Sequence, residues 1–271
     1  MRAVRVMGIV NATPDSFSDG GRHLDPDAAI AHGCELAAEG ASIIDVGGES
    51  TRPGAEPVAA DEELRRTRPV VAGLAALGLT VSIDTSKASV AEAALDAGAE
   101  VVNDISALRG DPAMARLCAE RGCTVVLMHM LGTPRTMQVD PRYEDVVAEV
   151  GGFLAGRVKA AIEAGIDPER IWVDPGIGFG KTLDHNLELL RRIDELAALG
   201  RPLLVGASRK EFIGRITGRG VDGRRGGDVA ANVLAMAGGA EVLRVHDVGP
   251  LVAALEAAEL LLGRRPWERA A

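Results

Sequence analysis

The sequence is poor in aromatic residues, in cysteine and in uninterrupted apolar stretches, and each shortage excludes a class of protein. Aromatic residues make up 3% of the 271 residues, but a hydrophobic fraction of 47% is still enough for a well-buried core. The three cysteines, Cys34, Cys118 and Cys123, form an odd, scattered set without a C-x-x-C pair, which argues against a disulfide framework and against a zinc site. We expect them to be buried thiols in a reducing compartment.

No apolar stretch approaches the ~20 residues that a bilayer-spanning helix needs. The N-terminal residues also lack the charged segment and long apolar run of a signal peptide. The expectation is a soluble cytoplasmic protein without a membrane partner.

Positively charged residues are outnumbered, because the chain has 30 lysines and arginines against 39 aspartates and glutamates, and its formal net charge is −9. Nucleic acid is therefore not an expected partner, and an anionic substrate would need a local concentration of arginine and lysine.

Short β-branched runs alternate with amphipathic runs rich in Ala, Leu and Glu along the whole chain. Continuous apolar runs of this length are typical of strands that are covered on both faces, as in parallel sheets. They predict strands at 4–10, 42–46, 80–84, 101–104, 124–129, 171–174, 202–206 and 241–246. Helices are predicted at 26–39, 60–77, 87–97, 112–121, 143–164, 184–199, 228–238 and 249–262.

Eight β–α units over about 250 residues predict an α/β fold of the (β/α)8 TIM-barrel type. No linker-like or low-complexity segment divides the chain, so we expect one domain over residues 1–271, with a loop at 218–228. A doubly wound open sheet is the structural alternative, but the glycine-rich first turn of such sheets is absent.

Nearly every predicted strand ends in a polar or charged side chain. The residues at these ends are Asn11, Asp84, Asn103, Asp104, His129, Asp174, Ser208, Arg209, Lys210, Arg244 and His246. In a barrel these ends converge on the face that hosts active sites. One such Asp is most often the cap of the next helix, but so many together indicate a binding site. His129 taken alone is more readily a packed core histidine than a ligand.

The residue types at this face divide into two groups. Asp84, Asn103 and Asp174 are hydrogen-bond acceptors and suit a ligand rich in N–H groups. The cationic candidates suit an anionic group, and barrels often hold phosphate near strands seven and eight. They are Arg52, Lys210, Arg244 and His246.

The segment DPGIGFGKT (174–182) resembles a nucleotide-binding P-loop but is not one, because Pro175 stands where that motif needs glycine.

Several motifs, in order along the chain, resemble those of the dihydropteroate synthases. They are GIVNATPDSFSDGG (8–21), IIDVGGESTRPGA (43–55), SIDTSK (82–87), VVNDIS (101–106), LMHMLGTPRTMQ (127–138), DPGIGFGKT (174–182), GASRKEFIG (206–214) and RVHDV (244–248). Members of that family are (β/α)8 barrels, which agrees with the independent count of strands and helices. The resemblance implies a transferase of folate biosynthesis, the target of sulfonamides, that joins 6-hydroxymethyl-7,8-dihydropterin diphosphate to p-aminobenzoate and releases pyrophosphate.

The resemblance also implies roles for particular residues. The expected catalytic residues are Lys210, Asp174, Arg244 and His246. The expected pterin-binding residues are Asp84, Asn103, Ile105, Met128, Asp174, Phe179, Gly206 and Lys210. The diphosphate is expected to contact Asn11, Arg52, Arg244 and His246. The aminobenzoate is expected to contact Phe17, Thr51, Pro53, Phe179, Lys210 and Glu211. Asn11 is the expected ligand of a Mg2+ cofactor, and the expected assembly is a homodimer.

Two local features follow from this comparison. The polar loop 11–21 is expected to close over the diphosphate as a lid and to exclude water. Glu211 stands where the family often has a neutral or basic residue near the aminobenzoate carboxylate, and like charges there would repel. A non-catalytic pterin-binding paralogue and a methyltetrahydrofolate methyltransferase-like enzyme are the alternative functions.

Overall fold

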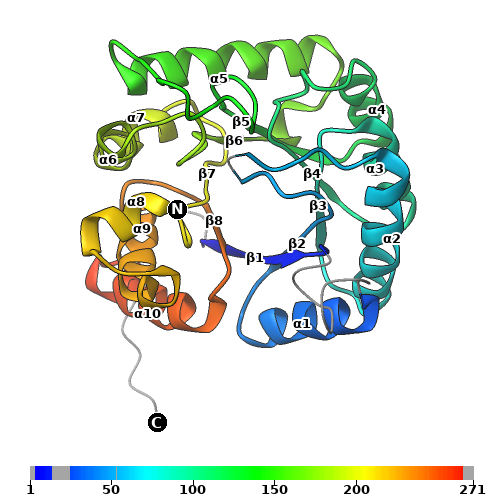
Figure 1. The fold of residues 1–271 in the computed structure, drawn as a ribbon, viewed down its shortest axis with the longest axis horizontal. Helices are drawn as coiled ribbons and strands as arrows, with labels where there is room; N and C mark the ends of the chain where they lie inside the picture. The colour runs from blue at the N-terminus through cyan, green and yellow to red at the C-terminus, as the bar shows by residue number, and fades with distance from the viewer. Residues whose placement is uncertain (1–3, 14–24, 53, 265–271) are drawn as a thin grey trace.

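The computed structural model describes residues 4–13, 25–52 and 54–264, which contribute eight strands to one parallel sheet. The strands are β1 (Arg5–Asn11), β2 (Ile43–Gly47), β3 (Val81–Asp84), β4 (Val101–Asp104), β5 (Thr124–Met128), β6 (Ile171–Asp174), β7 (Leu204–Val205) and β8 (Val242–Val245). Neighbours in the sheet follow the order β6-β5-β4-β3-β2-β1-β8-β7. A parallel bridge between Val173 and Leu203 joins the two ends of this order, so the sheet closes into a barrel (Figure 1).

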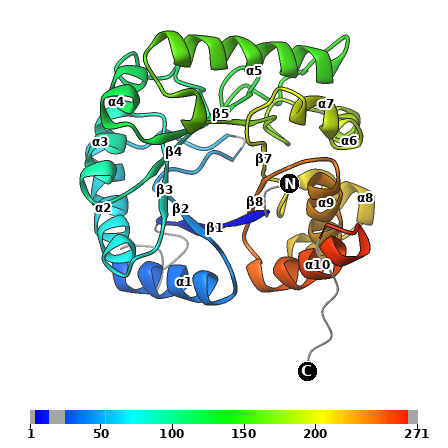
Figure 2. The same cartoon turned by 180° about the vertical axis from the view of Figure 1, so that it is seen from behind.

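Helices surround the strands on the outside, as Figures 1 and 2 show from opposite sides. They are α1 (Pro26–Ala38), α2 (Ala60–Ala76), α3 (Ala88–Asp96), α4 (Met114–Arg121), α5 (Val146–Glu163), α6 (Leu183–Arg191), α7 (Ile193–Ala197), α8 (Glu211–Thr217), α9 (Arg225–Ala237) and α10 (Val248–Leu261). The predicted (β/α)8 barrel is confirmed. Within the described residues, no helix combines the length and apolar character that crossing a membrane requires.

Side chains inside the barrel form two layers, because residues two apart on a strand point to the same face. The layer nearer the N-terminal ends of the strands is apolar and consists of Met7, Ile43, Val101, Val126, Trp172, Leu204 and Val242. Two positions further along these strands stand Asp45, Asn103, Met128, Asp174, Gly206 and Arg244. The second layer therefore rests on an apolar plug and faces the C-terminal mouth of the barrel. We call Asp45, Asp84, Asn103, Asp174 and Arg244 the polar layer.

A larger apolar cluster fills the space between the sheet and the helices. Ile44, Ile83 and Leu127 point outward from their strands into this cluster, and Leu74 and Leu154 reach it from α2 and α5. Each such buried side chain contributes about 1.5–3 kcal/mol relative to an exposed one. The rigid framework that positions the polar layer is thus aliphatic, as the scarcity of aromatic residues requires.

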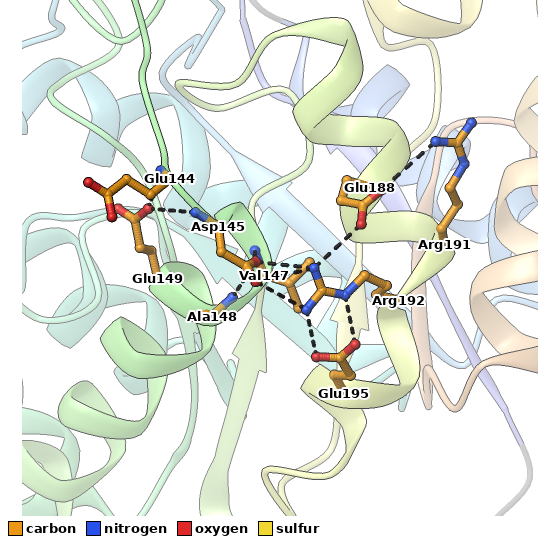
Figure 3. A network of polar contacts seen from close by, with 9 residues as sticks. All are labelled: Glu144, Asp145, Val147, Ala148, Glu149, Glu188, Arg191, Arg192 and Glu195. Atoms are coloured by element: carbon orange, nitrogen blue, oxygen red, sulfur yellow. Dashed lines mark hydrogen bonds and ion pairs between the residues drawn. The ribbon is translucent and has the colours of Figure 1, made fainter.

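The single helix expected at 184–199 is divided at Arg192, whose backbone torsions of φ −112° and ψ 32° leave the helical region. Its guanidinium donates hydrogen bonds to Asp145, Glu188 and Glu195 (Figure 3). Asp145 also caps α5 by accepting hydrogen bonds from the backbone amides of Val147 and Ala148. At this break, one arginine side chain links the start of α5 to Glu188 on α6 and Glu195 on α7.

Residues 218–228, expected to be a loop, are partly helical. A 3-10 turn, η2 (Val221–Gly223), precedes α9, which begins at Arg225 rather than at 228. The short helix α8 before it was also not expected. Glycine has a low helix propensity, but the buried residues Asp228 and Ala231 anchor α9 to the barrel, and tertiary packing overrides propensity there.

Candidate active site

Arg244 lies at the centre of the polar layer and bridges carboxylates from two other strands. Its Nε donates to Asp45 Oδ2 at 2.6 Å, and its Nη2 donates to Asp84 Oδ2 at 2.7 Å. The side-chain amide of Asn103 donates to the same Asp45 oxygen at 3.1 Å. Burial raises the pKa of Asp84 to about 7, although the charge of Arg244 acts in the opposite direction. Two of the three nitrogens of the Arg244 guanidinium are thus held by protein carboxylates.

Asp45 is a site residue that the sequence reasoning missed. It is fully buried, and it connects Asn103 on β4 to Arg244 on β8. Its signal in the sequence was its place two residues after Ile43 in the second predicted strand, which puts it on the inner face of a barrel.

Asp174 and Lys210 face the same interior from β6 and from the turn after β7. The backbone N–H of Gly176 donates to Asp174 Oδ1 at 2.7 Å. Burial raises the pKa of Asp174 to about 6, against the effects of that hydrogen bond and of nearby Lys210. Burial and then Arg244 lower the pKa of Lys210 to about 8. Near neutral pH, a carboxylate and an ammonium group are therefore both available here.

An apolar wall stands beside these charged groups. Met128, Met130, Met137 and Phe179 form one buried cluster, and Ile105 packs against it. The Lys210 Nζ lies 4.0 Å from the centroid of the Phe179 ring. The structure thus brings together the three apolar residues that were expected to enclose a flat ring, Ile105, Met128 and Phe179.

Lys181 and His129 form a second buried pair, behind this wall. The Lys181 Nζ donates to His129 Nδ1 at 2.9 Å and to the backbone carbonyl of Phe179 at 2.9 Å. His129 packs edge-on against Phe153, with ring centroids 4.9 Å apart. Burial, then the charge of Lys181, lower the pKa of His129 to about 3, and burial lowers the pKa of Lys181 to about 7. His129 is therefore a core histidine, as expected, and Lys181 anchors the loop that carries Phe179.

A cavity of about 640 Å³ lies beside the C-terminal mouth of the barrel, between the ends of β1 and β8 and the helices α1 and α10, where His32 and Pro250 line it. Three residues that were expected to bind diphosphate line it, namely Asn11, Arg52 and His246. Arg209 and Arg225 also line it; both pair with Asp247, at 3.1 Å and 3.8 Å. Glu39 and Asp247 line the cavity as well, so its three arginines exceed its acidic residues by one, and Arg52 is the arginine that Asp247 does not engage.

His246 departs from the expectation that it would be a cation. Burial, and then the charges of Arg209 and Arg244, lower its pKa to about 3. Its Nδ1 lies 3.3 Å from the hydroxyl oxygen of Ser208. Without a ligand, His246 is a neutral hydrogen-bonding group, because neighbouring positive charges and desolvation both disfavour a second proton.

The remaining predicted residues lie around this mouth or outside the described part of the chain. Thr51 is half-buried and Arg52 is exposed in the connection after β2, and Glu211 is exposed at the start of α8. Gly206 follows β7, beside Arg244. Phe17, Pro53 and residues 14–21 of the expected lid lie outside the described residues.

Comparisons with known proteins identify the family of this chain. A protein-family model described as "Pterin binding enzyme" matches residues 7–246 of this chain. The dihydropteroate synthase of Mycobacterium leprae is 51% identical over 261 residues, covering 93% of this chain and 92% of that protein.

This chain belongs to the dihydropteroate synthases. Among solved structures, the Xanthomonas albilineans dihydropteroate synthase with 4-aminobenzoic acid superimposes with a TM-score of 0.91 at 50% identity, covering 96% of this chain and 93% of that one. The same enzyme in complex with 7,8-dihydropteroate gives a TM-score of 0.87 at 47% identity, covering 96% and 94%. The transferase function that the motifs imply is therefore confirmed.

Proposed function

We propose that the polar layer and Lys210 hold the pterin ring, while the arginine-rich cavity beside the barrel mouth holds the diphosphate. One observation supports this assignment: the buried acceptors above the apolar plug and a cavity lined by Asn11, Arg52 and His246 lie toward the same C-terminal ends of the barrel strands. A ring with N–H edges and a diphosphate tail matches both parts at once.

In the inner part, Asp174 and Asn103 accept hydrogen bonds from the pterin N–H groups, and Lys210 donates to an acceptor on the ring. Asp84 acts here together with Arg244, because the two are already paired at 2.7 Å. Ile105, Met128 and Phe179 pack against the ring. Gly206 has no side chain and leaves the space beside Arg244 open.

In the outer part, Arg52 and His246 contact the diphosphate oxygens, and Arg244 extends its positive charge toward them from below. An arriving diphosphate would raise the pKa of His246, because a nearby negative charge favours the imidazolium form. His246 then changes from a neutral donor to a cationic one as the substrate binds.

Asn11 fits a Mg2+ ion that arrives with the diphosphate. The described residues contain no group of three or more His, Cys, Asp or Glu side chains that could hold a metal alone. Mg2+ commonly combines one or two protein oxygens with phosphate oxygens and retained water, and the Asn11 amide oxygen is such a ligand. Bound there, Mg2+ would neutralise charge on the leaving pyrophosphate.

The bond between the pterin methylene carbon and the diphosphate oxygen breaks, and its electron pair leaves with pyrophosphate. The positive charge that develops on the methylene is delocalised into the ring, where ionised Asp174 favours it. The aminobenzoate nitrogen then donates its lone pair to that carbon, and the resulting ammonium loses a proton to water. No strong base is needed, because an aniline is neutral at pH 7.

For the aminobenzoate, we propose contacts with Thr51, Phe179 and Lys210, with Phe17 and Pro53 completing the pocket from outside the described residues. Glu211 is exposed, so its carboxylate can stay in water away from that of the substrate. A homodimer, a single barrel domain over the chain and a cytoplasmic location also stay proposals.

The direct test combines purified protein with Mg2+, the pterin diphosphate and p-aminobenzoate, and measures dihydropteroate and pyrophosphate. We expect both products in equal amounts. Lys210→Ala and Asp174→Ala should each lower the rate by about 100-fold or more. Lys159→Ala, at an exposed position on α5, is the matched control and should leave the rate unchanged. Equal rates in wild type and Asp174→Ala would contradict the assignment of the pterin site.

A further inference from the structure

Arg209 adopts a left-handed backbone conformation in the turn that leads from β7 to α8. Its φ is +56°, a region that residues with a Cβ atom occupy at a cost of about 1 kcal/mol or more. The turn follows the buried residues Ala207 and Ser208 and delivers Lys210 to the site. A contact from outside the turn must therefore stabilise this conformation.

Asp228, in the first turn of α9, supplies that contact. Its Oδ2 accepts a hydrogen bond from the backbone N–H of Arg209 at 2.9 Å. Asp228 is only 5% exposed, and its Oδ1 has no hydrogen-bond partner among the residues that the structure describes. A buried carboxylate that uses one oxygen in this way costs stability. Its single side-chain hydrogen bond to the strained residue thus indicates a role in geometry rather than in stability.

Two further contacts hold the same turn. Arg224, at the start of α9, donates from Nη1 to the carbonyls of Arg209 and Lys210, at 3.2 Å and 3.4 Å. The Arg209 guanidinium makes two hydrogen bonds to Asp247. Within the described part of the chain, only Asp228 accepts a hydrogen bond from the backbone N–H of Arg209. It fixes the peptide plane that precedes the left-handed residue, while Arg224 fixes the carbonyl that follows it.

The position of Lys210 leaves little tolerance for a shift of this turn. Its ammonium lies 4.0 Å from the centroid of the Phe179 ring. A Cβ atom added at Gly178 would come within 3.2 Å of Lys210 Cδ, so the lysine stem fills the available space. A shift of about 1 Å in the reacting geometry can cost about 100-fold in rate.

We propose that Asp228 is a positioning residue that holds Arg209 in its left-handed conformation and thereby aims Lys210 into the pterin site. The inference rests on the role of Lys210 proposed above. Asp228 itself touches no substrate and acts only through the turn.

The kinetic test is a double-mutant cycle between Asp228 and Arg209. Asp228→Ala removes the acceptor and should lower kcat/KM for the pterin diphosphate by about 100-fold. Asp228→Asn keeps an acceptor oxygen and should restore most of the rate, even if both variants melt at lower temperature. Glycine adopts positive φ freely, so in an Arg209→Gly background the Asp228→Ala change should cost about threefold or less. Any effect of losing the Arg209 side chain cancels in the cycle.

A second readout needs no turnover. The sequence contains four lysines, so each can be followed by NMR of protein labelled at the lysine Cε, with Lys210 assigned from its missing signal in Lys210→Arg. The pKa of Lys210 should be near 8 in the wild type and in Asp228→Asn. It should rise toward 10.4, the ordinary lysine value, in Asp228→Ala, because the ammonium then escapes to solvent.

Equal losses for Asp228→Ala in the two backgrounds, or an unchanged Lys210 titration, would overturn the inference. If Asp228→Ala does not fold, Asp228→Ser, whose shorter side chain cannot reach the Arg209 amide, takes its place with the same expectations. A wild-type protein that makes no dihydropteroate would refute the proposed function, whereas the NMR titration would still decide whether Asp228 positions Lys210.

Discussion

Arg244 lies where the sequence predicts it, but it makes contacts that the sequence does not predict. The motif RVHDV puts it at the end of a strand, and the structure confirms that position. Its guanidinium, however, is held by Asp45 and Asp84 rather than directed only toward an anion. These two ion pairs cannot be predicted from a local sequence pattern, because their members are 199 and 160 positions apart in the chain.

At this scale, Asp45→Asn tests the charge network. The change removes a buried negative charge that accepts from Arg244 at 2.6 Å and from Asn103 at 3.1 Å. We expect a loss of about 2 kcal/mol in the free energy of unfolding. Misplacement of Arg244 and Asn103 should also lower kcat/KM by more than about tenfold.

Thermal or urea unfolding together with steady-state kinetics measures both effects of Asp45→Asn. Asp96→Asn removes an exposed partner of Arg121 and is the control, with a change within about 0.5 kcal/mol and full activity. Wild-type activity in Asp45→Asn would show that the network does not orient the site.

The pH dependence of kcat/KM for the pterin diphosphate tests Asp174 and Lys210 together. Asp174 accepts pterin N–H groups only when ionised, and its pKa is raised to about 6, so activity should rise with pH through about 6. Lys210 donates only when protonated, and its pKa is lowered to about 8, so activity should fall above about 8. This ratio reports ionisations of the free enzyme. Lys210→Arg should abolish the alkaline limb; an unchanged limb would assign it to another group.

At the scale of elements, the connection between β6 and α6 carries the site and is anchored from below. Lys181 links this loop to the side chain of His129, which follows β5, and Gly176 lies against the backbone carbonyl of the same histidine. Gly176 has φ +66°, and a Cβ atom added there would lie 2.0 Å from the His129 carbonyl oxygen. The glycine is therefore required both by its backbone conformation and by the close approach.

Gly176→Ala should destabilise the protein by more than about 2 kcal/mol and displace Phe179 from the ring site. Gly152→Ala is the matched control, because a Cβ atom added there, in the middle of α5, meets no atom within 4 Å beyond the adjoining backbone of its own helix. It should instead stabilise the protein by about 0.5–1 kcal/mol. Unfolding experiments and pterin binding by calorimetry measure both variants; equal effects at the two glycines would refute the argument.

At the scale of the whole molecule, the outer face of α9 offers a surface for the proposed homodimer. Leu234 on α9 is 65% exposed, and Leu261 at the end of α10 is also exposed. Leu234→Asp should therefore shift the molar mass measured by light scattering toward that of one chain. Leu77→Asp, at a leucine 61% exposed after α2, should leave the mass unchanged. A dimer unaffected by Leu234→Asp would place the interface elsewhere.

The sequence predicts the eight strands because hydrophobic periodicity is a local property, and the observed bounds differ from the expected ones by only a few residues. The errors lie where distant contacts decide local structure. The helix predicted at 184–199 is interrupted at Arg192, whose side chain bonds Asp145 on a distant segment. Helix α9 begins before the predicted residue 228, and its Asp228 bonds the backbone of Arg209. The roles of all the predicted site residues, in binding and in catalysis, stay predictions.

Sequence alone determined the alternation of strands and helices, and with it the barrel and the gathering of polar strand ends at one mouth. These follow from the side-chain periods of 2 residues in strands and 3.6 residues in helices, which are visible among neighbouring residues in the sequence. Only the tertiary structure decided which charges are paired with one another and which remain for a ligand. Asp45, Lys181 and Asp228 acquire their roles from burial and from partners on other strands and helices. Electrostatic energies depend on such distances and on exclusion of water, which no local stretch of sequence contains.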